Sequence, residues 1–210
     1  MARRSSEDAA RTRLEIISAA AKVFCREGIT GATLEEIALE AGITRGAIYW
    51  HFKGKQGLLQ ALLNEHPLPL ERPMPPGISF APGWERLGQA LEETMSDDIA
   101  RRLSRIMLHK SERVAGDDPV ESRLQRIRSS FIEQLRTLLI NAMANDELAD
   151  SLDIDLIGDV FQSCISGLLF DVLREGESNQ QKIPAMLDTL RHLLFNPPAH
   201  WLRPEANGCT

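Results

Sequence analysis

The sequence predicts an all-α fold, with a three-helix N-terminal domain followed by a larger helical domain. Apolar residues recur at three- and four-residue spacing along most of the 210 residues, as they do in amphipathic helices. Runs of β-branched residues are scarce, and the chain has one Tyr and seven Phe. Six prolines crowd residues 67–82, where they exclude a helix interior or a central strand. We therefore expect a domain at 1–66, a linker at 67–82, a helical domain at 83–195 and a tail at 196–210.

The first expected helix runs from Glu7 to Arg26 and ends before Gly28. It should support the two helices that follow it. One more helix is expected after this three-helix unit, from Gly54 to Glu65, where Pro67 closes it. The apolar stripe of the first helix consists of Leu14, Ile17, Ala20, Ala21 and Phe24.

Between these helices, residues 33–52 carry the signals of a helix, a glycine turn and a second short helix. Thr33 and Glu36 match the T-x-x-E capping box that begins a helix. Gly42 can adopt the left-handed conformation that ends one. Thr44 is a good N-cap for the second helix, and Ile48 and Phe52 share the face that should pack inward.

The remaining positions of the second helix form a surface without acidic residues. This layout is typical of a helix-turn-helix that binds double-stranded DNA. Lys53 and Lys55 add positive charge next to that surface. A different reading stays open, because helix-glycine-helix units are common, the aromatic residues could be core and the lysines could be solvated. The available residues are Arg45, Gly46, Ala47, Tyr49, Trp50 and His51.

These side chains suit different parts of a DNA duplex. Arg45, at a helix start, can donate two hydrogen bonds to guanine O6 and N7. Gly46 and Ala47 are small enough for close approach to the bases, while Tyr49 and His51 can donate to phosphates.

The pattern T-L-x-x-I-A-x-x-A-G-I-T-R-G-A-I-Y-W-H-F-K-x-K-x-x-L, from Thr33 to Leu58, resembles the TetR family of bacterial transcriptional repressors. The segment from Thr12 to Ala32 also fits, so the motif covers roughly the first third of the chain. The stretch T-R-G-A-I-Y-W-H-F is similar to that of the AcrR-like branch, whose members repress multidrug efflux pumps. The proline-rich linker departs from the family pattern, which leaves open how its two domains are coupled.

The resemblance implies a homodimeric repressor that a small hydrophobic effector releases from a palindromic operator. In this family, base reading usually falls at the positions of Arg45 and Ala47, and phosphate contacts at those of Tyr49, His51 and Lys55. The full set of positions implied to lie at or near DNA is Thr33, Thr44, Arg45, Gly46, Ala47, Tyr49, Trp50, His51 and Lys55.

Charge is distributed unevenly along the chain. The net charge is −6, but residues 1–66 hold nine Lys and Arg against eight Asp and Glu. The DNA-facing part is thus slightly positive, while the acidic remainder discourages indiscriminate DNA binding. No apolar run approaches the ~20 residues of a membrane span, and the N-terminus lacks the apolar core of a secretory signal. We expect a cytoplasmic protein without membrane association.

Catalytic and metal-binding motifs are not found. The sequence lacks G-x-S-x-G, H-E-x-x-H, a P-loop and G-x-G-x-x-G, so we expect no enzyme and no cofactor. Cys25, Cys164 and Cys209 are far apart and form no C-x-x-C pair, which argues against zinc or a disulfide framework. Cys25 and Cys164 are expected to be buried, and redox sensing by Cys164 or Cys209 is an alternative.

Beyond the linker we expect five helices, with Ser96 as the N-cap of the second. Their ranges are Trp84–Met95, Asp97–Val114, Val120–Ala144, Ile154–Arg174 and Gln181–Phe195. The last two are apolar over a wide face, which suggests both a core and a four-helix interface with a second subunit. The expected interface residues are Phe161, Leu168, Val172, Met186 and Leu190.

A small-molecule pocket is expected among these helices, lined by apolar groups with few hydrogen-bonding ones. Plain core packing explains the same pattern. The candidate lining residues are Ser104, Leu108, Phe131, Leu135, Ile165, Ser166 and Phe170.

Two other functions remain open. The chain could be a ligand- or partner-binding helical protein that no longer binds DNA specifically. It could also regulate a metabolic operon that is unrelated to efflux.

Overall fold

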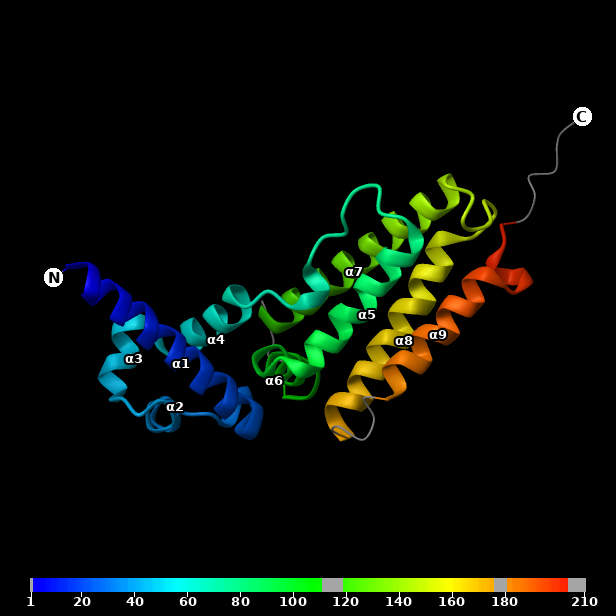
Figure 1. The fold of residues 1–210 in the computed structure, drawn as a ribbon. Helices are drawn as coiled ribbons and strands as arrows, with labels where there is room; N and C mark the ends of the chain where they lie inside the picture. Colours follow the sequence, from blue (N-terminus) through cyan, green and yellow to red (C-terminus); the bar gives the residue numbers. More distant parts are fainter. Residues whose placement is uncertain (1, 111–118, 176–180, 204–210) are drawn as a thin grey trace, which may run out of the picture. The chain divides into compact units, whose positions relative to one another are not determined.

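The structure, a computed structural model, describes residues 2–110, 119–175 and 181–203. Within these ranges the chain folds into helices, and the only β-type pairing is an isolated bridge between Leu152 and Leu202. Figure 1 shows the helices in chain order. The expected all-α fold is confirmed.

The helices form two compact units, each described here by itself. Unit 1 comprises Met1–Leu68 and Ser96–Leu124, and unit 2 comprises Pro69–Met95 and Gln125–Thr210. This differs from the expected division, in which 83–195 formed one domain. The reason is that α6 (Asp98–Arg105) and η2 (Ile106–Lys110) contact α1 (Ala2–Gly31).

Unit 1 is organised around α1, which kinks at Gly28, where φ is 80°. The helix contacts α2, α4, α6 and η2. Leu14, expected in the core, is 57% exposed, and the buried face centres instead on Ile16, Ile17, Ala20, Val23 and Phe24. The other helices of the N-terminal segment are α2 (Leu34–Ala41), α3 (Arg45–His51) and α4 (Gly54–Glu65).

A polar contact also joins α1 to α4. Arg13 forms an ion pair with Glu65, and its guanidinium carbon lies 4.7 Å from the centre of the Phe52 ring. Phe52 itself is buried at the end of α3. The cation therefore holds α4 while covering the aromatic ring that anchors α3.

Unit 2 has an aromatic cluster in its core. The rings of Phe80 and Trp84 stack with their centres 5.5 Å apart. The centre of the Phe161 ring lies 5.8 Å from that of Trp84 and 6.2 Å from that of Trp201. These contacts join α5, α8 and the C-terminal turn η4. The elements of unit 2 are η1 (Pro69–Glu71), α5 (Phe80–Ser96), most of α7 (Pro119–Ala144), α8 (Ile154–Glu175), α9 (Lys182–Phe195) and η4 (Ala199–Trp201).

The expected linker contains helical structure at both ends. Pro69–Glu71 forms a 3₁₀ turn, and α5 begins at Phe80 and includes Pro82. Proline is tolerated in a first helical turn, where its missing N–H would have no partner inside the helix. The Phe80 N–H donates to the Glu147 carboxylate at 2.7 Å. A side chain that is distant in the sequence therefore caps the start of α5 in place of a neighbouring residue.

The next helix also differs from expectation. Its N-cap is Asp97 rather than Ser96, because the Asp97 carboxylate accepts from the Ala100 N–H at 2.7 Å. The α-helix ends at Arg105 and continues as a π-helical turn from Ile106 to Lys110. Residues 111–114 of the expected helix lie outside the described residues.

By length and composition alone α8 is apolar enough to cross a membrane, a property that core helices of soluble proteins share. The segment Ile154–Arg174 has a mean hydropathy of 1.5, and 44% of that window is buried within the protein. Its buried side chains include Ile157, Phe161 and Ile165. In this structure the helix packs within the core of unit 2.

Alanine substitutions at two glycines of α5 are expected to change stability in opposite directions. A Cβ at Gly83 would lie 2.4 Å from Cδ1 of the fully buried Leu138. We expect Gly83→Ala to lower the free energy of unfolding by about 1–3 kcal/mol, because Leu138 cannot move without disturbing its neighbours. Urea denaturation measures this change.

Gly88→Ala is the matched control on the same helix, since its Cβ would meet Leu187 Cδ1 at 3.4 Å. This variant should be neutral or stabilising by up to ~1 kcal/mol, because alanine restricts the unfolded chain. Equal unfolding midpoints for the two variants would contradict the packing described for Gly83.

The stability of unit 1 is expected to depend on pH through His66, at the end of α4. Its Nε2 is buried and lacks a hydrogen-bond partner among the described residues. Burial lowers the pKa of His66, Arg123 lowers it further, and Glu65 and Asp97 oppose the shift. The histidine should therefore stay neutral in the folded protein below the ordinary value of 6.5.

The unfolded chain takes up this proton as pH falls through about 6.5, whereas the folded chain does so only at lower pH. The stability contributed by neutral His66 is thus fully present above this value and is lost as pH falls toward the lowered pKa. His66→Gln should show a smaller loss of unfolding free energy between pH 8 and pH 5.5 than the natural chain. Identical losses in the two proteins would refute this assignment.

Candidate nucleic-acid interface

The start of α2 is fixed by the expected capping box. The Thr33 hydroxyl accepts from the Glu36 N–H at 3.2 Å, and the Thr33 N–H donates to the Glu36 carboxylate at 2.9 Å. The hydrogen bonds from the Thr33 side chain and backbone lower the pKa of Glu36. Both groups are therefore engaged in holding the entrance to α2.

The turn between the helices depends on backbone conformation. Gly42 has a φ of 68°, and its N–H bonds to the carbonyls of Ala38 and Leu39. A Cβ at Gly42 would touch nothing within 4 Å, so the left-handed backbone rather than space selects glycine. Thr44 then caps α3 by accepting from the Ala47 N–H at 3.3 Å.

The two faces of α3 differ sharply in exposure. Ile48 is fully buried and Phe52 is 5% exposed, whereas Tyr49 is 50% exposed and Trp50 is 75% exposed. Tyr49 and Trp50 therefore form an exposed aromatic surface opposite the buried anchor of α3. Arg45 and Gly46 are also exposed, while Ala47 and His51 are half-buried.

Arg45 is already engaged at this surface. It forms an ion pair with Glu35 of α2, and it donates to the Tyr49 hydroxyl at 3.1 Å. The Tyr49 hydrogen bond and the charge of Glu35 raise the pKa of Arg45. The surface expected to lack acids therefore receives one from the neighbouring helix.

Sequence reasoning missed Glu35, although the signal was present in the Leu34-Glu35-Glu36 run. Only Glu36 stands three residues after Thr33 and can close the capping box. Glu35 is left without a local role, exposed in the first turn of α2, where it meets Arg45.

Lys55 has an internal role as well. Its ammonium donates to the carbonyl oxygens of Thr30 and Ala32, both at 2.9 Å. These carbonyls lie at the end of α1, where helical partners are missing. Lys53, in contrast, is exposed at the N-cap position of α4 and makes no side-chain capping bond there.

The candidate ligand-lining residues do not form one group. Ser104 and Leu108 belong to unit 1, and the others belong to unit 2. Phe131, Leu135 and Ile165 are buried there. Ser166 accepts a hydrogen bond from Gln162 at 2.7 Å, and Phe170 is 40% exposed beneath the Arg174 guanidinium. Phe170 is therefore a surface residue rather than part of an enclosed lining.

The expected dimer residues are mostly core residues of a single chain. At most 6% of each of Phe161, Leu168, Val172 and Leu190 is exposed, so they offer little surface to a second copy. Their place at an intermolecular face stays a prediction. Met186 alone of the five is half-buried.

The cysteines differ from expectation too. Cys25 and Cys164 are both half-buried free thiols rather than buried ones. Cys209 lies outside the described residues. Among the described residues, no group of three or more His, Cys, Asp or Glu is placed to hold a metal ion.

Comparisons with known proteins agree with this geometry. The family described as bacterial regulatory proteins, tetR family, matches residues 16–62. SrpR, an HTH-type transcriptional regulator of Pseudomonas putida, is 34% identical over 206 residues, which are 98% of this chain and 96% of SrpR.

Solved structures resemble the fold over most of its length. One is NalD, the secondary repressor of the MexAB-OprM multidrug efflux pump in Pseudomonas aeruginosa. Its TM-score is 0.71 at 25% identity, and the match covers 91% of this chain and all of NalD. The SmeT–triclosan complex, from Stenotrophomonas maltophilia, has a TM-score of 0.68 at 24% identity over 87% of this chain and 90% of SmeT.

The motif of α2 and α3, the exposed face of α3 and the full-length similarity to SrpR lead to one conclusion. The chain belongs to the tetR family of bacterial regulatory proteins and is a DNA-binding transcriptional repressor, not an enzyme.

Proposed function

We propose that this protein is a cytoplasmic homodimer that represses a multidrug efflux operon by binding a palindromic operator. A small hydrophobic ligand releases it from the DNA. The observation that carries the proposal is the exposed face of α3, which presents Arg45, Tyr49 and Trp50 above a buried anchor of Ile48 and Phe52.

In this proposal α3 lies in the major groove. Arg45 leaves Glu35 and donates to a guanine, where its planar fork can make two hydrogen bonds. Gly46 and Ala47 allow the helix to approach the bases, and Tyr49 and His51 contact phosphates. Thr33, Thr44 and Trp50 lie beside the same duplex, and Lys55 stays at the end of α1 with its charge close to the backbone phosphates.

Two copies are needed because one short helix reads only a few base pairs. A two-fold dimer presents two α3 helices about one DNA turn apart or a multiple of it, which matches a palindrome. We propose that α8 and α9 supply the contact between copies. Exposed aromatic residues support this, since Phe170 is 40% exposed and Phe195 is 48% exposed.

The effector is proposed to bind in unit 2, near the apolar side chains of Phe131, Leu135 and Ile165. The presence of triclosan in the SmeT complex supports a hydrophobic ligand, and the role of NalD as a repressor of an efflux pump supports efflux control. Such a ligand releases DNA only if it binds the released state more tightly than the operator-bound state.

Substitutions of Arg45 and Glu35 test whether α3 binds the DNA bases. Arg45→Ala should weaken binding to DNA from upstream of the protein's own gene on the order of tenfold or more, and should relax the choice of one base pair. Mobility-shift titrations with natural and single-base-altered duplexes measure both effects.

Glu35→Gln is the matched variant, because it removes the competing carboxylate and keeps Arg45. It should bind the same DNA more tightly, by roughly two- to fivefold, since an exposed ion pair is weak. If neither variant changes DNA binding, α3 is not the reading helix. If the natural chain binds no upstream DNA at all, the alternative of a ligand-binding protein without DNA binding takes its place.

Lys53 and Lys55 should behave differently although they are two residues apart. Lys53→Ala should weaken all DNA sequences alike and reduce the slope of log affinity against log salt by about one, without changing the melting temperature. Lys55→Ala should lower the melting temperature as well, because the carbonyls of Thr30 and Ala32 lose their partner. A normal melting temperature for Lys55→Ala would show that these bonds do not support the fold.

A further inference from the structure

Unit 1 contains a second positively charged site, separate from the α3 surface. It is an open pocket of about 480 Å³ between α1, α2 and α6, lined by Lys22, Cys25, Arg26, Glu40, Arg102 and Arg105. Four of the six lining residues are cations and one is an acid, so the lining carries a net charge of +3. Cations gathered in one concave surface repel each other, and an anion relieves that repulsion.

The acids near this pocket neutralise it only in part. The Lys22 ammonium lies 3.1 Å from a Glu40 carboxylate oxygen, and an Arg26 nitrogen lies 3.7 Å from the other. Glu40 is therefore shared by two cations, and the Lys22 hydrogen bond lowers the pKa of its carboxyl. Arg26 has a second and closer partner, the Glu27 carboxylate, at 2.6 Å.

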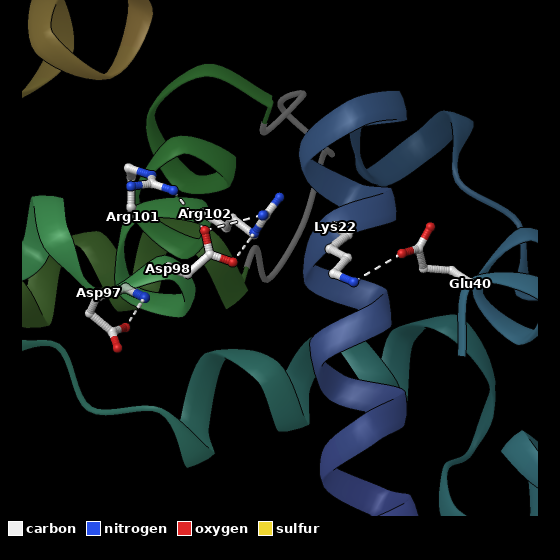
Figure 2. A network of polar contacts seen from close by, with 7 residues as sticks. Lys22, Glu40, Asp97, Asp98, Arg101 and Arg102 are labelled. Atoms are coloured by element: carbon white, nitrogen blue, oxygen red, sulfur yellow. Dashed lines mark hydrogen bonds and ion pairs between the residues drawn. The ribbon is translucent and has the colours of Figure 1, made fainter. Parts of the chain in front are cut away.

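On the α6 side, Asp98 binds Arg102 at 2.9 Å, and the Arg102 hydrogen bond lowers the pKa of that carboxyl. Figure 2 shows Lys22 on α1 between Glu40 of α2 and the Asp98–Arg102 pair of α6. Arg105, one turn after Arg101, is exposed and has no ion-pair partner in the part of the chain that the structure describes.

Size and chemistry define the ligand class. A volume of about 480 Å³ is in the range of small-molecule sites and exceeds what one monoatomic ion fills. Arginine forks bind phosphate and carboxylate groups through paired hydrogen bonds. Cations on two helices, Arg26 on α1 and Arg105 on α6, suit a ligand with at least two negative groups.

We infer that this pocket binds a small polyanion bearing phosphate or carboxylate groups, which bridges α1 and α6. The site is independent of the proposed DNA contacts. Arg45 pairs with Glu35 in the first turn of α2, whereas the pocket is built around Glu40 near the end of that helix.

The test uses the full-length protein and two probes, pyrophosphate and citrate, at constant ionic strength set with sodium chloride. Isothermal titration calorimetry should show saturable binding of at least one probe; pyrophosphate alone indicates a phosphate ligand and citrate alone a carboxylate ligand. Arg105→Gln should weaken that binding on the order of tenfold, since it removes a charge-assisted contact. Glu40→Gln should strengthen it several-fold, because Lys22 loses its competing carboxylate and Arg26 keeps only Glu27.

Arg128→Gln is the charge-matched control, because Arg128 is exposed on α7 and lies outside the pocket lining. It should bind the probes as the natural chain does. Absence of saturable binding, or equal weakening by Arg105→Gln and Arg128→Gln, would overturn the inference. If Arg105→Gln changes only DNA binding and its salt slope, the pocket contacts DNA phosphates and the inference is also wrong.

Cys25 provides an independent readout, because it lines the pocket and is half-buried. Bound probe should slow alkylation of Cys25 by neutral iodoacetamide, as followed by peptide mass spectrometry. Cys164, also half-buried but in unit 2, should react at an unchanged rate. Equal slowing at both thiols indicates general stabilisation and would count against a site at Cys25.

Discussion

The buried face of α1 is the constraint on which unit 1 depends. Ile16, Ile17, Ala20 and Phe24 are completely buried, and the helix contacts α2, α4, α6 and η2. Neither α2 with eight residues nor α3 with seven is long enough to be stable alone in water. Their orientation therefore comes from packing, of α2 on α1 and of α3 on α2.

This arrangement explains why α3 can expose so much aromatic surface. The helix is held by only a few groups, chiefly Ile48 and Phe52, and Phe52 is covered in turn by Arg13. Arg13 also pairs with Glu65, so the same side chain supports α3 and α4. Once the buried side of α3 is anchored in this way, the rings of Tyr49 and Trp50 can remain exposed.

The sequence predicted features whose partners are close along the chain. The capping box of Thr33 and Glu36, the left-handed Gly42 and the Thr44 cap each depend on residues within four positions, so local pattern was sufficient. The Arg45–Glu35 pair spans ten positions and the Lys55 bonds span 23 and 25, so they depend on tertiary packing. Apolar periodicity likewise cannot separate a core residue from an interface residue, and Phe161, expected at an interface, packs against Trp84 within a single chain.

The grouping of α6 with the N-terminal helices has a mechanical consequence. A helix that contacts α1 shares a packed core with the element that orients α2 and α3. Packed cores resist continuous deformation, so a displacement of α6 must be met by α1 or by loss of their contact. Cations from both helices line the pocket beside this contact, and Glu27, Glu40 and Asp98 neutralise them only in part. The contact between α1 and α6 therefore combines close packing with incompletely neutralised charge. A bound anion can change the strength of this contact, whereas it cannot change the apolar anchoring of α3 by Ile48.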